Sequence, residues 1–232
     1  MECRYSTARI AQRGRQSRGG KMDYSNRRLI PQSLQEGFIG TLSPLVRLLS
    51  KWKLSPNSFT VAGAVITAFG AAAFGLGYFR PAGLLILAGG VCDTIDGMIA
   101  RRCGKASRFG ALLDSCVDRY AEFFMLVGIA VYFMHLADYG TSAGAVLALC
   151  GSFMVSYTRA RAESLGLDAR IGIMQRPERI VLIGLGALIH ITVFKLAIWL
   201  VAMLANWTAL QRIRYAYKQD PGGFKEDIVL EP

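Results

Sequence analysis

Long uncharged stretches alternate with short polar connections along most of this chain. Residues 54–79 and 139–158 contain no charged side chain, and four further stretches, 81–100, 109–134, 180–194 and 196–211, are apolar apart from a few ionisable positions. About 20 apolar residues suffice to cross the hydrocarbon core of a bilayer. The pattern therefore predicts an all-α integral membrane protein with about six transmembrane helices, the last two short and joined by a tight turn at residues 190–195.

The remaining segments divide the chain further. Residues 1–30 are basic and poor in apolar side chains, so we expect a disordered N-terminal tail. Within residues 31–54, apolar side chains recur every three or four positions beside Arg47, Lys51 and Lys53. This spacing predicts an amphipathic juxtamembrane helix that contacts membrane lipids, although an ordinary helix packed on the bundle is the alternative. Residues 55–214 then form the six-helix membrane domain, followed by a polar C-terminal tail at 215–232.

The positive charge is distributed asymmetrically. The net charge is +11, and eleven of the 27 Lys and Arg residues precede the first expected span. Four more lie between the second and third spans, whereas the alternate connections contain only Arg80 and Lys195. This is the positive-inside pattern, which predicts a multi-pass protein of the cell (inner, cytoplasmic) membrane with both termini and the 101–108 connection in the cytoplasm. Membrane orientation explains the charge, so no nucleic-acid partner is expected.

Four carboxylates interrupt the apolar sequence. Asp93 and Asp96 are three residues apart and Asp114 and Asp118 are four apart, so each pair shares one face of a helix. An aspartate at the centre of a membrane helix costs about 2.5 to 3.5 kcal/mol, so the cluster needs compensation. Three interpretations are open: structural pairing with nearby arginines, transport of protons or cations, and a divalent-metal site, since carboxylate oxygens suit Mg²⁺ and Mn²⁺.

Small residues beside the carboxylates favour the metal site. Gly97, Ala100 and Gly110 leave room that a phosphate-bearing ligand needs and a proton does not. Arg101, at the cytoplasmic end of the same segment, supplies a cation for phosphate oxygens. The chemistry indicated is metal-assisted transfer of a phosphoryl-type group, with a cation or proton transporter as the competing class.

These residues spell Asp93-x2-Asp96-Gly97-x2-Ala100-Arg101-x8-Gly110-x3-Asp114-x3-Asp118. The spacing resembles the signature of the CDP-alcohol phosphatidyltransferases. The resemblance implies transfer of a phosphatidyl group from CDP-diacylglycerol, or a related CDP-lipid, to an alcohol, with release of CMP. It also implies a homodimer that uses two divalent cations, Mg²⁺ or Mn²⁺, with Asp118 as general base on the acceptor hydroxyl. The implied metal ligands are Asp93, Asp96, Asp114 and Asp118, and the implied CDP-lipid-binding residues are Gly97, Ala100, Arg101, Gly110, Pro56, Asn57 and Thr60.

A second polar segment, residues 156–179, carries the arginines that we expect to bind the acceptor phosphate: Arg159, Arg161, Arg176 and Arg179. Positive-inside anchoring with local pairs to Glu163 and Glu178 is the alternative. The runs Ser156-Tyr157-x2-Ala160-Arg161-Ala162-Glu163 and Arg176-Pro177-Glu178-Arg179 resemble the bacterial phosphatidylinositol phosphate synthases. That resemblance implies inositol 1-phosphate as the phosphorylated polyol acceptor, with phosphatidylinositol phosphate as product. Glycerol 3-phosphate, as in a phosphatidylglycerophosphate synthase, satisfies the same basic segment and stays open.

Overall fold

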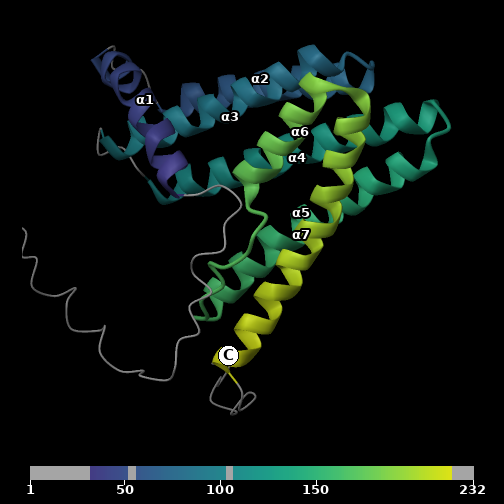
Figure 1. Ribbon diagram of the computed structural model, residues 1–232. Coiled ribbons are helices and arrows are strands. Elements are labelled where there is room, and N and C mark those ends of the chain that lie inside the picture. The colour runs from purple at the N-terminus through teal and green to yellow at the C-terminus, as the bar shows by residue number, and fades with distance from the viewer. Residues whose placement is uncertain (1–31, 52–55, 103–106, 221–232) are drawn as a thin grey trace, which may run out of the picture.

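The computed structural model describes residues 32–51, 56–102 and 107–220, and every regular element within them is an α-helix. The seven helices run in chain order as α1 (Gln32–Lys51), α2 (Pro56–Gly75), α3 (Phe79–Arg102), α4 (Arg108–His135), α5 (Tyr139–Ser164), α6 (Arg176–Ile189) and α7 (Ile191–Gln219). Figure 1 shows the helices as one bundle, with α1 at one end. The predicted all-α class is confirmed.

Within the described part of the chain, three helices are long and apolar enough to cross a membrane: α3 over Phe79–Ile99, α5 over Tyr139–Ser164 and α7 over Ile191–Gln219. By length and composition, these three helices are candidate membrane spans. The expected tight turn is present but shorter than residues 190–195, because α6 ends at Ile189 and α7 begins at Ile191. Helix α7 has 29 residues, so the expectation that both of the last two helices are short is wrong for it. His190 alone joins α6 and α7, and its Nδ1 accepts a hydrogen bond from the Thr192 backbone N–H at 3.2 Å. Helix α7 then continues past residue 214, the expected end of the membrane domain.

The main packing contacts connect helices α2 to α7 in a closed ring. Helix α2 packs on α3 and α4, α4 packs on α5, α5 on α7, α7 on α6, and α6 returns to α3. Figure 1 shows α2 beside α3 and α5 beside α7. Because helices distant in sequence close the ring, α6 is held next to α3, which carries two of the four predicted carboxylates.

Small residues allow the closest helix contacts, as is common for helices packed in lipid. A Cβ atom added at Gly83 of α3 would lie 2.7 Å from the Gly184 carbonyl oxygen of α6. An added Cβ at Gly128 of α4 would collide with the Ala71 carbonyl of α2. Glycine at these two positions therefore lets the α3–α6 and α2–α4 backbones touch.

An aromatic cluster fills the end of the bundle where α3 begins. Phe74 and Phe194 are fully buried and stack at 5.2 Å between ring centroids, with an interplanar angle of 8°. Phe79 and Phe133 complete the cluster. This end of the bundle is apolar and closely packed, whereas the aspartates of α3 lie toward the opposite end of that helix.

Helix α1 packs on α3 and also exposes apolar side chains. Val46 is buried against Ile95 and Ile99 of α3, whereas Phe38 and Leu48 are 47% and 52% exposed. The two interpretations of this segment are thus compatible, since one side of the helix contacts the bundle and another is free for lipid. Its position at a membrane surface stays a prediction.

Candidate active site

The predicted carboxylates meet where α3 and α4 face each other. Asp93, Asp114 and Asp118 each offer a carboxylate oxygen, and these three atoms all lie within 4.8 Å of one another. Asp96 lies outside this group of three but is buried and lines the same small cavity as Asp93 and Asp118. A cluster of hard oxygen donors fits Mg²⁺ or Mn²⁺ by ligand type, so these residues could hold such ions.

Arg176, at the start of α6, contacts this cluster directly. Its Nη1 lies 2.8 Å from Asp93 Oδ2, and its Nη2 lies 2.7 Å from Asp118 Oδ1. The guanidinium thus links α6 to one carboxylate of α3 and one of α4. Its Nε is buried and makes no hydrogen bond within the described part of the chain. Arg176 therefore balances charge in the cluster and keeps one donor that a ligand could satisfy.

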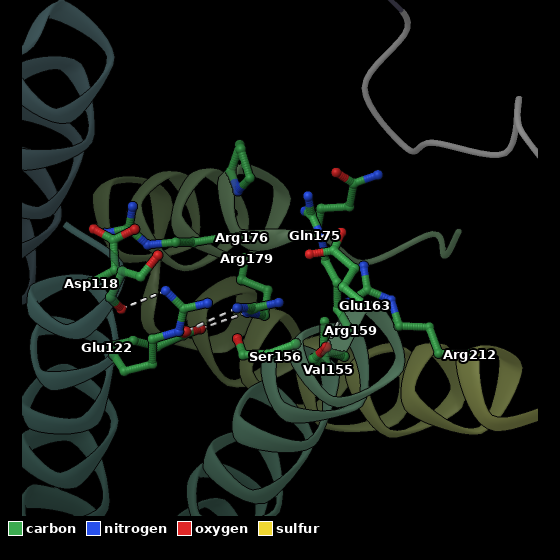
Figure 2. A pocket seen from close by; sticks show the side chains of 14 residues that line it. Asp118, Glu122, Val155, Ser156, Arg159, Glu163, Gln175, Arg176, Arg179 and Arg212 are labelled. Carbon is green, nitrogen blue, oxygen red and sulfur yellow. Dashed lines mark hydrogen bonds and ion pairs between the residues drawn. The ribbon is translucent and has the colours of Figure 1, made fainter. Parts of the chain in front are cut away.

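A cavity of about 380 Å³ opens beside the carboxylates. Asp118 and Arg176 line one side of it, and Arg159, Arg179 and Arg212 are among the other lining residues (Figure 2). Its lining contains five arginines, the fifth being Arg119, against three carboxylates. The excess of positive charge suits an anionic ligand, because Arg forks match phosphate oxygens. Asp118 and Arg176 also line the smaller carboxylate cavity, so the two spaces meet at these residues.

Arg179 is a buried wall of this cavity. Its Nε and Nη2 donate to the two carboxylate oxygens of Glu122 at 2.5 and 2.9 Å, and its Nη1 donates to the Met174 carbonyl at 3.3 Å. The side chain is 1% exposed. Three of the five guanidinium N–H donors thus have protein partners, and the charge of Arg179 is paired with Glu122, so Arg179 fixes the shape and charge of the wall.

The other predicted acceptor arginines lie apart. Arg159 lines the cavity and pairs with Glu163 at 3.1 Å. Arg161 is exposed and is not among the residues that line the cavity, so its part in acceptor binding stays a prediction. Two positions along an α-helix turn the side chain by about 200°, so neighbouring arginines on α5 cannot both face the cavity.

Sequence reasoning missed Glu122 and Arg212. Glu122 follows Asp114 and Asp118 at four-residue spacing on α4, so the helix period could have placed it on the same face. Arg212 is buried, and its Nε and Nη1 donate to the carbonyls of Ile171 and Val155 at 2.8 and 2.5 Å. An ionisable residue in an apolar membrane helix is a candidate functional residue, so both Glu122 and Arg212 could have been selected from the sequence.

The expected CDP-lipid residues are only partly described. Gly97 is half-buried on α3, and Gly110 is half-buried in the first turn of α4. The Gly110 N–H donates to Ser107 Oγ at 2.9 Å, which caps α4 just before the carboxylates. The side chains of the others lie outside the described residues: Pro56, Asn57, Thr60, Ala100 and Arg101. Their part in binding stays a prediction.

Curated relatives place this arrangement among known proteins. The chain is 37% identical over 180 residues to the archaetidylinositol phosphate synthase of Pyrococcus horikoshii, which covers 76% of this chain and 92% of the relative. It is 31% identical over 191 residues to the phosphatidylinositol phosphate synthase of Mycolicibacterium smegmatis, covering 78% of this chain and 86% of the relative. Both relatives thus match most of their own length.

Solved structures of a phosphatidylinositol phosphate synthase also resemble this chain. The crystal structure of Mycobacterium tuberculosis phosphatidylinositol phosphate synthase with CDP-DAG bound superposes with a TM-score of 0.69 at 28% identity, covering 75% of this chain and 92% of that one. The same enzyme in complex with manganese and citrate gives a TM-score of 0.69, covering 75% and 88%. The sequence profile of the CDP-alcohol phosphatidyltransferases matches residues 53–212. The chain belongs to the CDP-alcohol phosphatidyltransferase family.

Proposed function

We propose that this membrane enzyme of phospholipid synthesis transfers a phosphatidyl group from CDP-diacylglycerol to inositol 1-phosphate, giving phosphatidylinositol phosphate and CMP. The observation that carries the proposal is the junction of a carboxylate cluster with an arginine-lined cavity at Asp118 and Arg176. The first suits metal-bound diphosphate and the second suits an acceptor that carries its own phosphate. The names of the Pyrococcus and Mycolicibacterium relatives support an inositol phosphate acceptor.

Asp93, Asp96, Asp114 and Asp118 would hold two divalent cations, Mg²⁺ or Mn²⁺. When bound, such ions stabilise the negative charge that develops on phosphate oxygens during the displacement. The fit rests on the donor set, since three of these carboxylates offer oxygens within 4.8 Å of one another. The manganese-bound structure of the Mycobacterium tuberculosis enzyme supports this assignment.

Asp118 is the proposed general base, because its carboxylate belongs to the cluster and also faces the acceptor cavity. In the proposed step, the acceptor hydroxyl oxygen bonds to the phosphorus that carries the diacylglycerol, and its proton passes to Asp118. The bond from that phosphorus to CMP breaks, and CMP leaves with the electron pair. A positioned carboxylate contributes to such a step by removing the proton as the new bond forms.

Arg176 and Arg159 are the proposed contacts of the acceptor phosphate. Arg176 has a buried Nε without a partner in the described chain, and its fork lies 2.7 Å from Asp118. A phosphate held there would bring the rest of the acceptor close to the base. Arg179 and Arg212 would form the charged wall behind it.

We also propose that α2 to α7 all span the cytoplasmic membrane, with the active site facing the cytoplasm, and that the enzyme works as a homodimer. The charge asymmetry supports the orientation. Cysteines introduced at Arg80 or Arg170 should react differently with a membrane-impermeant thiol reagent in intact cells, with only Arg80→Cys labelled. If only Arg170→Cys were labelled, the protein would have the opposite orientation in the membrane. Chemical cross-linking of the protein in membranes tests whether it forms a homodimer.

The decisive experiment reconstitutes the purified protein with CDP-diacylglycerol and Mg²⁺ or Mn²⁺. Inositol 1-phosphate, glycerol 3-phosphate, serine and free inositol are added separately, CMP is measured, and lipid products are identified by mass spectrometry. We expect CMP release only with inositol 1-phosphate and only with the metal. A lipid product formed from glycerol 3-phosphate instead would show that glycerol 3-phosphate, not inositol 1-phosphate, is the acceptor. Ion flux without CMP release would favour a transporter. A parallel arm with an ether-linked CDP-lipid tests the lipid chains.

A further inference from the structure

A second cavity, of about 260 Å³, lies between the loop after α5 and the last turns of α7. Residues 171–173 of the loop form one wall, and Trp207, Arg214 and Lys218 are among the residues of the other. It shares no lining residue with the active-site cavity. The proposed reaction gives this space no role.

Hydrogen bonds fix the loop that forms this cavity against α7. The Met174 N–H donates to Thr208 Oγ1 at 3.1 Å, and Arg212 Nε donates to the Ile171 carbonyl at 2.8 Å. Farther along α7, Gln219 Oε1 accepts from the Asp168 N–H at 2.8 Å. Gly172, at φ +127°, packs on Thr208 so closely that a Cβ atom would collide with the threonine methyl. The cavity is therefore bounded by a fixed wall.

The α7 side of the cavity changes from apolar to cationic along the helix. Arg214 and Lys218 follow Trp207 by seven and eleven residues, so the three side chains lie on one face of α7. At a rise of 1.5 Å per residue, Arg214 lies about 10 Å and Lys218 about 16 Å beyond Trp207. Arg214 is exposed and has no ion pair with any described carboxylate. Across from them, Ile171 and Ile173 add apolar surface.

This order matches the layers of a phospholipid at the edge of a bilayer. Indole rings concentrate at the membrane–water interface, and Lys or Arg side chains just beyond it attract anionic headgroups. We propose that this cavity binds one anionic phospholipid. Its phosphate lies at Arg214 and Lys218, and its glycerol and first acyl methylenes lie against Trp207 and the two isoleucines. This lipid is neither donor nor product in the proposed reaction.

The chemistry selects against two related ligands. A zwitterionic phospholipid carries its own ammonium group beside the phosphate, which offsets the attraction to two cations. Inorganic phosphate would satisfy the cations but would leave the apolar half of the cavity unused. An anionic headgroup attached to an acyl chain uses both parts.

Fluorescence quenching tests the site locally. The protein is placed in phosphatidylcholine nanodiscs that contain a minor fraction of either phosphatidylglycerol or phosphatidylcholine brominated near the glycerol end of the acyl chains. The Trp207 signal is the difference between the wild-type protein and Trp207→Phe. We expect brominated phosphatidylglycerol to quench this signal more than brominated phosphatidylcholine. Arg214→Gln with Lys218→Gln should weaken the preference by about fivefold for each cation removed.

Arg80→Gln is the matched control, because it removes an exposed cation outside the cavity. It should retain the preference. Equal quenching by the two lipids in the wild type, or an unchanged preference in the double variant, would overturn the proposal. If inorganic phosphate at low millimolar concentration displaced the brominated phosphatidylglycerol, the cavity would be a simple anion site and the phospholipid proposal would be overturned. If the double variant does not fold, a salt titration of the wild type replaces it, since a preference unaffected by salt excludes the cation contacts. CMP release is not needed for any of these readings.

Discussion

The buried pair between Glu122 and Arg179 offers the sharpest quantitative test. Glu122 and Arg179 are 6% and 1% exposed, and two hydrogen bonds join them at 2.5 and 2.9 Å. Replacing Glu122 with Gln keeps the shape and one carbonyl acceptor but removes the negative charge. The guanidinium would then be a buried cation with only the Met174 carbonyl and one amide oxygen as acceptors.

The expected cost follows from burial. Removing one partner of a buried ion pair costs about 3–5 kcal/mol, because the remaining charge is left uncompensated. Since Gln can still accept one of the two hydrogen bonds, we expect the lower end, about 3 kcal/mol. For a chain of this size, 1 kcal/mol shifts the Tm by about 2–4 °C, so Glu122→Gln should lower the Tm by about 6–12 °C.

Glu163→Gln is the matched control, since it makes the same substitution in a partly exposed pair. Glu163 accepts from Arg159 and Arg170, each at 3.1 Å, with its side chain 38% exposed. Solvent screens such pairs to about 0–1 kcal/mol, so its Tm should fall by at most about 4 °C. Tryptophan fluorescence during heating in detergent measures both. Equal decreases in Tm for Glu122→Gln and Glu163→Gln would refute the reasoning. A second test compares Glu122→Leu, Arg179→Leu and the double variant. A Tm decrease in the double variant equal to the sum of the two single decreases would also refute it, because it would show that the two side chains do not interact.

Three further predictions concern the active site and the far end of the bundle. Asp118→Asn should lower the rate of CMP release by about 10²–10⁴-fold while CDP-lipid binding, measured by calorimetry, is partly retained; near-normal turnover would remove the base role. Arg159→Gln should raise the KM for the acceptor several-fold more than the KM for the CDP-lipid, whereas Arg161→Gln should leave both unchanged; equal effects of the two variants would contradict the cavity assignment. Asp138 accepts a hydrogen bond from Lys195, which, with bonds from Thr141, lowers the pKa of Asp138 from 3.8 to about 2. Because the folded-state pKa is depressed, this stabilisation is present above pH 3.8 and is lost as the pH falls through 2. The Tm difference between the wild type and Asp138→Asn should therefore shrink over that window, and a difference that grows on acidification would contradict it.

The parts of the site that could be predicted from sequence are those set by local spacing. Asp93 and Asp96, like Asp114 and Asp118, needed only the helix period and the cost of burying charge in lipid to be expected together. The helix order was equally accessible, because uncharged runs of spanning length leave few alternatives. The turn between α6 and α7 was predicted too long because Lys195 was counted in the connection. Its ammonium instead reaches Asp138 at 2.7 Å from within α7.

Long-range pairing decided the rest. No local pattern shows that Arg179 contacts Glu122, 57 residues earlier in the chain, or that Arg176 reaches Asp93, 83 residues earlier. Both contacts depend on the ring closing so that α6 lies against α3. The orientation of Arg161 likewise depends on which face of α5 meets the cavity. The sequence of residues 156–179 therefore indicated anion binding by arginines. It could not distinguish Arg159, which lines the cavity, from Arg161, two residues farther along α5.

The cavity's arginines differ in how their charge is balanced, and that difference bears on what the cavity binds. Arg179 has a carboxylate partner in Glu122, Arg176 has two in Asp93 and Asp118, and Arg159 has one in Glu163. Arg119 and Arg212 form no ion pair with a described carboxylate: Arg119 Nη1 donates to the Ser115 carbonyl, and Arg212, 4% exposed, donates to the carbonyls of Ile171 and Val155. A buried cation stabilised only by dipoles retains most of its attraction for an anion, because no opposite charge cancels it. Arg212 is the more buried of these two arginines, so its charge gains most when a phosphate enters. Arg212→Gln should weaken acceptor binding more at low salt than at high salt, which acceptor titration at two ionic strengths would measure.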